Sequence, residues 1–300
     1  MIKRMLQFIR HQLIRYNLPL GLKALYYYYF HSPLDLKDPK TISEKIQWMK
    51  IHLYGYEQAP IYTFCADKYK VREYVKSCGC AHTLNELIAV YETPKDIVWE
   101  DLPKKFALKW NFGNGYNIIC QNKDNLDIPK TLKKLEKWGK EDPWLKSGEV
   151  QYRNTERKII IERFIESERG VLPVDYKVYC FYGKPYLLFT GEERGMGDHP
   201  KFYYFTLDWD LRLTIPDSKE EVEKARLIPR PHHFEEMISC ARKLSARFPF
   251  VRVDFYDTPE QLYFGELTFT PGGGFDFEEP YELRLDLGSQ LDLDRINVRM

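Results

Sequence analysis

Two neighbouring stretches near the end of the chain decide its fold. They are FVRVDFY at residues 250–256 and LYFGELTF at residues 262–269, and TPGGG follows at residues 270–274. Both stretches are rich in β-branched and aromatic residues, and a turn-forming DTPE segment separates them, so together they predict a β-hairpin. Because side chains alternate between the two faces of a strand, four polar residues are expected on one face: Arg252, Asp254, Glu266 and Thr268.

The two carboxylates on this face are candidate metal ligands. Carboxylates that meet across a hairpin repel each other unless a cation lies between them. Mg²⁺ binds carboxylate oxygens together with phosphate oxygens and water, so Asp254 and Glu266 suit it. The glycines at residues 272–274 would let backbone approach a ligand closely. The alternative interpretation is an ordinary solvent-exposed polar face, which antiparallel sheets often present.

Composition narrows the classes of protein. The 300 residues are 44% hydrophobic and 30% charged, which is typical of a folded globular chain. Lys and Arg number 45 against 44 Asp and Glu, so no overall positive field favours nucleic acid. The six cysteines show no paired zinc-ligand spacing, and the start of the chain lacks the features of a signal peptide, so we expect a cytoplasmic protein with free thiols.

Residues 2–14 have the pattern of a basic amphipathic helix. Six apolar residues form one stripe: Ile2, Met5, Leu6, Ile9, Leu13 and Ile14. Lys3, Arg4, Arg10 and His11 lie elsewhere around the helix. Such a helix packs on its own protein or on a partner in most cases, and it can also lie on an anionic membrane surface. We therefore expect a cytoplasmic protein with a candidate peripheral contact at the inner face of the membrane.

Further helices and strands follow along the chain. Thr41 with Glu44 has the spacing of a capping box, which predicts that a helix begins there. Additional helices are expected at about residues 67–76, 128–138 and 237–248, and strands at 106–110, 158–165, 176–181 and 185–190.

Charged residues at the ends of these strands or inside them are candidate site residues. Lys109 ends a strand and precedes Gly113 and Gly115, a combination that can hold phosphate through an ammonium group and backbone N–H groups, although a plain β-turn fits it too. Glu162, Asp175 and Lys177 lie within apolar strands, where internal ion pairs are the alternative. Arg194 follows a strand end and suits either an anion clamp or a surface loop.

Taken in order, these motifs resemble the ATP-grasp superfamily. The hairpin looks like the end of the D-alanine:D-alanine ligase pattern, Arg-Val-Asp-Phe followed by Glu-x-Asn-x-x-Pro-Gly. More narrowly, residues 38–293 resemble the TupA-like ATP-grasp family, which is associated with teichuronopeptide and other surface-polysaccharide biosynthesis. The motifs that carry this resemblance are PKTISEKIQW at 39–48, ADKYKVREYV at 66–75, DYK at 175–177 and GELTFTPGGG at 265–274.

The resemblance implies an α+β fold of the ATP-grasp type. Two α+β lobes, at about residues 61–160 and 161–300, would form an ATP-grasp domain over residues 61–300 and sandwich ATP. A helical extension over residues 1–60 would precede them. Lys109 would contact the α/β-phosphates beneath the loop of Gly113 and Gly115. The hinge strand would meet the adenine through Glu162, Phe164 and Ile165. A second strand would lie near the ribose and phosphates through Asp175 and Lys177.

The resemblance also implies the metal ligands and the catalytic residues. Asp254, Glu266 and Thr268 would bind Mg²⁺, while Arg252 and Arg194 would face the carboxylate and its transferred phosphoryl group. Superfamily members usually carry Asn where this chain has Thr268, and a hydroxyl is a poorer Mg²⁺ ligand than an amide oxygen. The third ligand of a second metal is therefore an open question.

The implied activity is ATP-dependent carboxylate–amine ligation through an acyl phosphate, with a uronic acid or a similar carboxylate and a small amine as substrates. A sugar kinase with the same ATP site is one alternative, and only product analysis separates the two. A metal-dependent glycosyltransferase is another, because Asp208-Trp209-Asp210 and Asp292-Leu293-Asp294 have the Asp-x-Asp spacing of such enzymes. No nucleic acid partner is expected, whereas the basic helix could contact a membrane or a glycosyltransferase complex.

Overall fold

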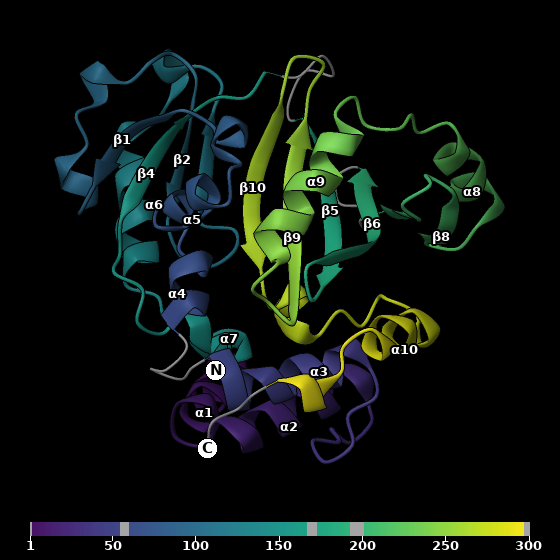
Figure 1. Ribbon diagram of the computed structural model, residues 1–300. Coiled ribbons are helices and arrows are strands. Elements are labelled where there is room, and N and C mark those ends of the chain that lie inside the picture. Colours follow the sequence, from purple (N-terminus) through teal and green to yellow (C-terminus); the bar gives the residue numbers. More distant parts are fainter. Residues whose placement is uncertain (1, 55–59, 167–172, 193–200, 297–300) are drawn as a thin grey trace.

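The computed structural model describes residues 2–54, 60–166, 173–192 and 201–296, and it contains two antiparallel sheets (Figure 1). The smaller sheet has the strand order β1-β4-β2-β3, with β1 at Leu87–Tyr91, β2 at Phe106–Trp110, β3 at Asn117–Cys120 and β4 at Ile159–Arg163. The larger sheet has the order β10-β9-β5-β6-β7-β8. Its strands are β5 at Val174–Phe181, β6 at Lys184–Glu192, β7 at Lys201–Phe205, β8 at Leu211–Ile215, β9 at Phe250–Asp257 and β10 at Leu262–Thr268. The smaller sheet lies beside the β10 edge of the larger one (Figure 1).

Helices cover these sheets and form a layer beneath them. The helices are α1 at Ile2–Tyr16, α2 at Leu18–Phe30, α3 at Ile42–Met49, α4 at Pro60–Ala66, α5 at Val71–Ser77, α6 at Ile128–Gly139, α7 at Trp144–Ser147, α8 at Lys219–Arg226, α9 at Phe234–Ser245 and α10 at Tyr281–Ser289. Figure 1 shows α1, α2, α3 and α10 at the lower end of both sheets. Among the described residues, no helix has the length and apolarity to cross a membrane.

The predicted capping box starts α3. The Glu44 N–H donates to Thr41 Oγ1 at 3.2 Å, and the Thr41 N–H donates to Glu44 Oε2 at 2.8 Å. These reciprocal bonds satisfy backbone donors that the first helical turn leaves without an intrahelical partner. The prediction of a helix beginning here is therefore confirmed.

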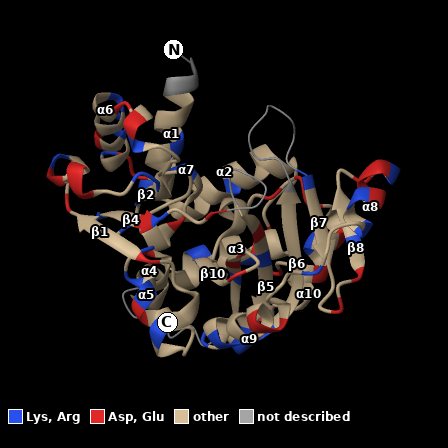
Figure 2. Cartoon of the chain, turned by 90° about the horizontal axis from the view of Figure 1, so that it is seen from above, with Lys and Arg blue, Asp and Glu red and all other residues tan. Residues whose placement is uncertain are grey.

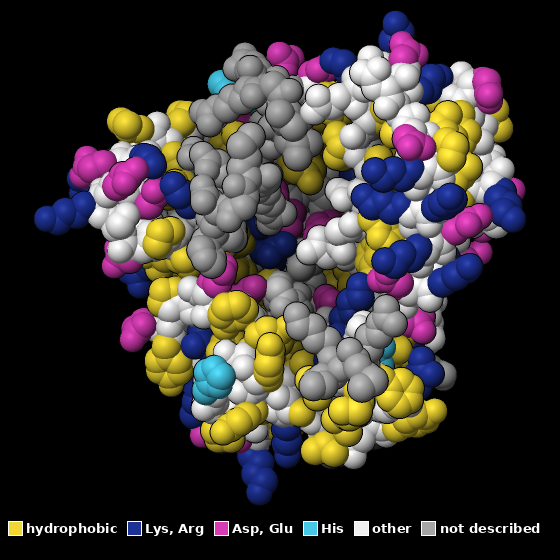
Figure 3. Space-filling model, turned by 180° about the vertical axis from the view of Figure 1, so that it is seen from behind, with side chains coloured by type: hydrophobic (Ala, Val, Ile, Leu, Met, Phe, Trp, Pro, Cys, Tyr) yellow, Lys and Arg dark blue, Asp and Glu magenta, His cyan; other side chains and the backbone are white. Residues whose placement is uncertain are grey.

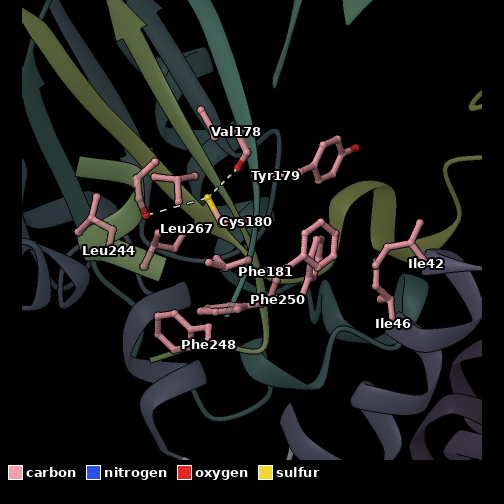
Figure 4. Close-up of a cluster of buried hydrophobic side chains, with 14 of the residues drawn as sticks. Ile42, Ile46, Val178, Tyr179, Cys180, Phe181, Leu244, Phe248, Phe250 and Leu267 are labelled. Atoms are coloured by element: carbon pink, nitrogen blue, oxygen red, sulfur yellow. Dashed lines mark hydrogen bonds between the residues drawn. The ribbon is translucent and has the colours of Figure 1, made fainter. Parts of the chain in front are cut away.

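The larger sheet is packed on both faces at its lower end. Cys180 and Val178 of β5 lie toward Leu244 of α9, whereas Tyr179 and Phe181 lie on the other side, toward α3 (Figure 4). Helix α9 packs along β5, β6 and β9. The opposite face of these strands, which carries Tyr179, also carries the polar side chains of Lys177, Arg252 and Asp254.

Several elements agree with the sequence expectations and others do not. The β9–β10 hairpin and helices α1, α6 and α9 lie where their patterns predicted them, within a few residues. The expected strand at 158–165 ends at Arg163, so Phe164 and Ile165 lie beyond β4. No strand was predicted at β1, β7 or β8. Each has five residues, and its buried and exposed side chains do not alternate cleanly.

Candidate active site

The larger sheet brings the predicted polar residues into one row. Asp254 of β9 stands directly opposite Glu266 on one neighbouring strand and Lys177 on the other. A β-bulge at Gly265 sets this register, because Phe264 pairs with Phe255 while Glu266 pairs with Asp254. A bulge places two residues of one strand opposite one of its partner and so redirects the side chains that follow. Without it, Gly265 would face Asp254 and Glu266 would lie opposite Val253.

Arg252 and Asp254 form a buried two-bond ion pair in this row. Arg252 Nε donates to Asp254 Oδ1 at 2.7 Å, and Arg252 Nη2 donates to Asp254 Oδ2 at 2.6 Å. Arg252 Nη2 also donates to Thr268 Oγ1 at 3.3 Å, and Thr268 Oγ1 donates to Glu266 Oε1 at 3.1 Å. All four residues of the predicted hairpin face are thus in contact. Bidentate geometry between Arg and a carboxylate is the strong form of such a pair.

Three cations surround the two carboxylates. Lys68 Nζ lies 3.3 Å from Glu266 Oε2, and Lys177 Nζ lies 4.0 Å from Asp254 Oδ2 while it also pairs with Asp175. Burial alone would raise the pKa of Glu266, but the Lys68 ammonium and the Arg252 guanidinium hold it at about 2. Burial raises the pKa of Asp254 against the opposing pull of Arg252 and Lys177. Glu266 is therefore ionised at neutral pH.

The smaller sheet contributes a lysine and a glycine loop. Lys109 at the end of β2 is 2.7 Å from Glu162 Oε2, and Arg72 holds the other oxygen of that carboxylate at 3.1 Å. The loop between β2 and β3 has positive φ at Gly113 (65°) and Gly115 (81°), a conformation that favours glycine. Lys68 Nζ donates to the carbonyl of Gly113 at 2.6 Å and so ties this loop to Glu266.

Residues of both sheets line a cavity of about 140 Å³ between them. Eight of the predicted site residues lie in its wall: Lys109, Gly113, Gly115, Asp175, Lys177, Arg252, Asp254 and Glu266. The cavity therefore combines cations, a glycine-bearing loop and three acids. Such a set can bind the phosphates of a nucleotide together with a divalent cation.

A second cavity of about 360 Å³ adjoins the first and shares Arg252, Glu266 and Lys177 with it. Aromatic side chains and Thr268 line it, and acids lie along one side: Glu149, Asp276, Glu278 and Glu279. Glu279 Oε1 accepts hydrogen bonds from Tyr179 (2.7 Å) and Tyr204 (3.1 Å). Burial and the nearby Asp276 raise the pKa of Glu279 to about 7.

Other predicted residues lie elsewhere. Glu162, Phe164 and Ile165 line neither of these two cavities. Glu162 is instead held by Lys109 and Arg72, and the Phe164 ring lies 5.6 Å from Lys105 Nζ. Arg194 lies outside the described residues.

The two Asp-x-Asp triplets are turn and capping sequences. Asp210 follows Trp209 in the turn between β7 and β8, where Trp209 stacks on Phe205. The Asp292 carboxylate accepts the Asp294 N–H at 3.1 Å and caps a short helix. Neither triplet lines the two cavities.

Lys68 is the main site residue that the sequence analysis did not single out. It lies in the turn between α4 and α5, within the ADKYKVREYV motif, and its N–H donates to the carbonyl of Asn111 at 2.8 Å. The motif was the available signal, but no local pattern indicates that this turn reaches Glu266. Asp276 and Glu279 were also missed, because they follow the triple glycine in a segment without periodicity.

The donor set fits a nucleotide-bound Mg²⁺. The described residues contain no group of three or more His, Cys, Asp or Glu side chains arranged as a metal site. Mg²⁺ at nucleotide sites typically takes one or two carboxylates and completes its shell with phosphate oxygens and water. Asp254 and Glu266 supply such a pair, and Lys68, Lys109 and Lys177 provide the charge that phosphates require.

The chain has distant structural likenesses to known proteins. The chain is similar to D-alanine–D-alanine ligase from Bacillus anthracis, at 16% identity and a TM-score of 0.42, over 77% of this chain and 68% of that one. It is also similar to L-amino acid ligase from Bacillus licheniformis, at 14% identity and a TM-score of 0.49, over 92% of this chain and 62% of that one. No curated protein sequence matches the chain.

These structural likenesses are distant. The family model described as TupA-like ATPgrasp matches residues 44–292, which is most of the chain and includes the complete hairpin and the Lys109 strand. The chain therefore belongs to the TupA-like ATP-grasp family.

Proposed function

We propose that this chain is an ATP- and Mg²⁺-dependent carboxylate–amine ligase. The observation that carries the proposal is the junction of the two cavities. A cavity with phosphate-binding character meets a larger, aromatic and acidic one at Arg252, Glu266 and Lys177. A phosphoryl group transferred at this junction would pass from a nucleotide in the first cavity to an acceptor in the second.

The residues of the smaller cavity bind and orient the nucleotide in this proposal. Lys109 and the loop of Gly113 and Gly115 hold its phosphates, and Lys177 with Asp175 lies alongside them. Asp254 and Glu266 would hold Mg²⁺, which when bound would neutralise charge on the phosphates. Arg252 orients the Asp254 carboxylate through hydrogen bonds to both of its oxygens. Positioning and charge neutralisation provide most of the catalysis in phosphoryl transfer.

The reaction balances in two steps. A carboxylate oxygen of the substrate attacks the γ-phosphorus of ATP, the bond to the β,γ-bridging oxygen breaks, and ADP leaves. The amine nitrogen then attacks the carbonyl carbon of the acyl phosphate, phosphate leaves, and the nitrogen loses a proton as the amide forms. Arg252 lies where charge develops in both steps, and a preorganised cation stabilises such charge most effectively away from water.

The acids of the larger cavity favour an amine there. Glu149, Asp276 and Glu279 line it, and burial together with repulsion from the nearby Asp276 carboxylate raises the pKa of Glu279. An ammonium group would relieve that repulsion. From the family context we propose a uronic acid or a similar sugar-linked carboxylate as the other substrate, in surface-polysaccharide biosynthesis in the cytoplasm.

The test is ADP release in the presence of a panel of uronic acids and amines, with hydroxylamine added to trap an acyl phosphate as a hydroxamate. A ligase should form a hydroxamate from a carboxylate alone and an amide when the amine is present. Phosphate found on a sugar hydroxyl, without any amine requirement, would assign a kinase instead. ADP release that Glu266→Gln leaves unchanged would contradict the role proposed for Glu266.

A further inference from the structure

The apolar side chains that the protein exposes are concentrated in α1 and α2. Among the described residues, eight of the twelve large hydrophobic side chains that are exposed lie between residues 5 and 28. In α1 they include Leu6, Phe8 and Ile9, with 57%, 62% and 45% of their surfaces exposed. Figure 3 shows hydrophobic side chains gathered at the lower end of the molecule, where these helices lie in Figure 1. A patch of this kind usually marks an interaction surface.

The exposed side of α1 is its strongly apolar side. Ile14 is 1% exposed and packs so closely on α2 that a Cβ atom on Gly21 would lie 2.8 Å from it. Met5 lies nine residues before Ile14, roughly 180° around the helix, and is exposed. Phe8, Ile9 and Tyr16 fall on the same side as Met5, within an arc of roughly 160° that also includes Leu6. Met5, Leu6 and Ile9 of the apolar stripe therefore point away from the body of the protein, whereas Ile14 packs against it.

Basic and acidic residues are also distributed unevenly between this region and the rest of the chain. Residues 1–34 contain five Lys and Arg and no Asp or Glu, which leaves 40 basic and 44 acidic residues in the rest of the chain. In Figure 2, α1 and α2 accordingly carry blue positions and no red ones. Lys23 of α2 is exposed on the same face as Leu20 and Tyr27, three residues before it and four after it. Arg15 is also partly exposed, 3.7 Å from Asp142.

We propose that the exposed faces of α1 and α2 bind the surface of an anionic lipid bilayer. Helices that lie in the membrane interface combine an apolar face with basic residues on the polar side. Residues 1–34 contain basic residues and no acids, so their charge complements that of an anionic lipid surface. Tyr and Lys are well suited to the interface because each has an apolar body that can contact the acyl chains and a polar tip that can reach the headgroups.

This surface connects directly to the larger cavity. Tyr29 of α2 stacks on Phe275 and Phe277, with ring centroids 5.1 and 5.7 Å away, and Asp276 between them lines the cavity. Phe277 is itself exposed. A protein bound through α1 and α2 would therefore hold the acidic side of that cavity close to the membrane.

Co-sedimentation with lipid vesicles tests the proposal without relying on catalysis. The full chain should bind phosphatidylcholine vesicles that contain phosphatidylglycerol, and binding should fall several-fold in high salt. Phe8→Ser with Ile9→Ser should reduce binding at least about tenfold, because two apolar side chains that the bilayer would bury are lost. The matched control is Val98→Ser with Leu227→Ser, two exposed apolar residues elsewhere, and it should bind like wild type.

A charge variant provides an independent arm. Lys23→Gln leaves the apolar faces intact and should weaken binding to the anionic vesicles by about fivefold. Thermal melting in the absence of vesicles checks that each variant is folded. Absent binding, equal binding to pure phosphatidylcholine, or unchanged binding by a folded Phe8→Ser, Ile9→Ser variant would overturn the proposal. Concentration-dependent self-association that these two substitutions abolish would assign the face to a protein contact and overturn it as well.

Discussion

Glu266 lines both cavities, and its contacts connect the β9–β10 hairpin to the glycine loop. It contacts Lys68 from the α4–α5 turn and Thr268 from its own strand, and it stands opposite Asp254. Lys68 in turn holds the Gly113 carbonyl, so one short chain of contacts links the glycine loop to the hairpin. At this scale the function depends on charge balance, and single substitutions should separate metal binding from chemistry.

Glu266→Gln and Arg252→Lys should fail in different ways. A neutral amide cannot balance the charge of a bound Mg²⁺, so Glu266→Gln should abolish turnover and raise the Mg²⁺ concentration that nucleotide binding requires. Arg252→Lys keeps a charge beside Asp254 but loses the two-bond geometry, so it should lower kcat by about 10²-fold with little change in nucleotide affinity. Steady-state kinetics with Mg²⁺ titration measures both.

The exposed Glu260→Gln in the β9–β10 turn is the matched control and should behave as wild type. An active Glu266→Gln enzyme with an ordinary Mg²⁺ requirement would contradict the metal assignment and leave the hairpin face as a purely structural polar cluster.

Glu279 should make stability depend on pH. Its pKa is raised from 4.5 to about 7, so the folded state binds a proton more tightly than the unfolded chain and loses stability as the pH rises from about 4.5 to 7. Glu279→Gln keeps an oxygen for Tyr179 and Tyr204 but removes this titration. Relative to wild type, the variant should gain about 1–3 kcal/mol of unfolding free energy between pH 5 and pH 8.

Urea unfolding at the two pH values measures this difference, with the exposed Glu278→Gln as the control. A variant whose stability relative to wild type is the same at both pH values would show that Glu279 does not titrate in this range.

At the scale of elements, the bulge at Gly265 determines which side chains face the site. Strand β10 pairs with β9 in one register up to Phe264 and in another from Glu266 onward. The backbones approach closely at the shift, because a Cβ atom on Gly265 would lie 3.0 Å from the Asp254 carbonyl oxygen. The carboxylate pair therefore depends on the absence of a side chain at residue 265.

Gly265→Ala should disturb the pair of carboxylates more than the fold. The added methyl group forces the two strands apart locally, which typically costs about 1–3 kcal/mol in a packed region. Activity should fall by a larger factor than stability explains, because Glu266 moves. Urea unfolding and kcat, measured together, test this. Gly191→Ala on β6, where the Cβ atom would meet the Lys201 oxygen at 3.3 Å, is the control with little effect on kcat. Equal losses of activity in the two variants would contradict the special role of the bulge.

At the scale of the whole molecule, the smaller cavity draws its wall from both sheets. Lys109 and the glycine loop come from the smaller sheet, and Asp254, Glu266 and Lys177 come from the larger one. Whether the chain divides at residues 60 and 160, as expected from the resemblance, remains a prediction. A nucleotide that fills this cavity would contact both sheets and should stabilise them together.

The melting temperature should therefore rise when nucleotide and Mg²⁺ are added together. A ligand at one hundred times its dissociation constant adds about 2.7 kcal/mol, which corresponds to roughly 4 °C for a chain of this size. ADP with Mg²⁺ should give this shift in differential scanning fluorimetry, Mg²⁺ alone should give little, and Glu266→Gln should lose the Mg²⁺-dependent part. A UDP-sugar that stabilises the protein more than ADP does would favour the glycosyltransferase alternative.

The sequence alone was sufficient for features that depend on local periodicity. The alternation in residues 250–256 predicted the polar face of the hairpin, and Thr41 with Glu44 predicted the start of α3. Both signals come from interactions between residues close in the chain, namely the period of two along a strand and the side chain-to-backbone bonds of a helix cap. The same locality explains why Lys109 and Gly113 could be recognised as one candidate anion site.

The tertiary structure decided the features that join distant segments. Lys68 meets Glu266 across almost two hundred residues, and Glu279 acquires its raised pKa only because folding buries it beside Asp276. The apolar stripe of α1 could be predicted from the sequence. The exposure of Met5, Leu6 and Ile9 could not, because it depends on Ile14 being the side chain that packs on α2. Desolvation and pairing are properties of the packed chain, so no local pattern encodes them.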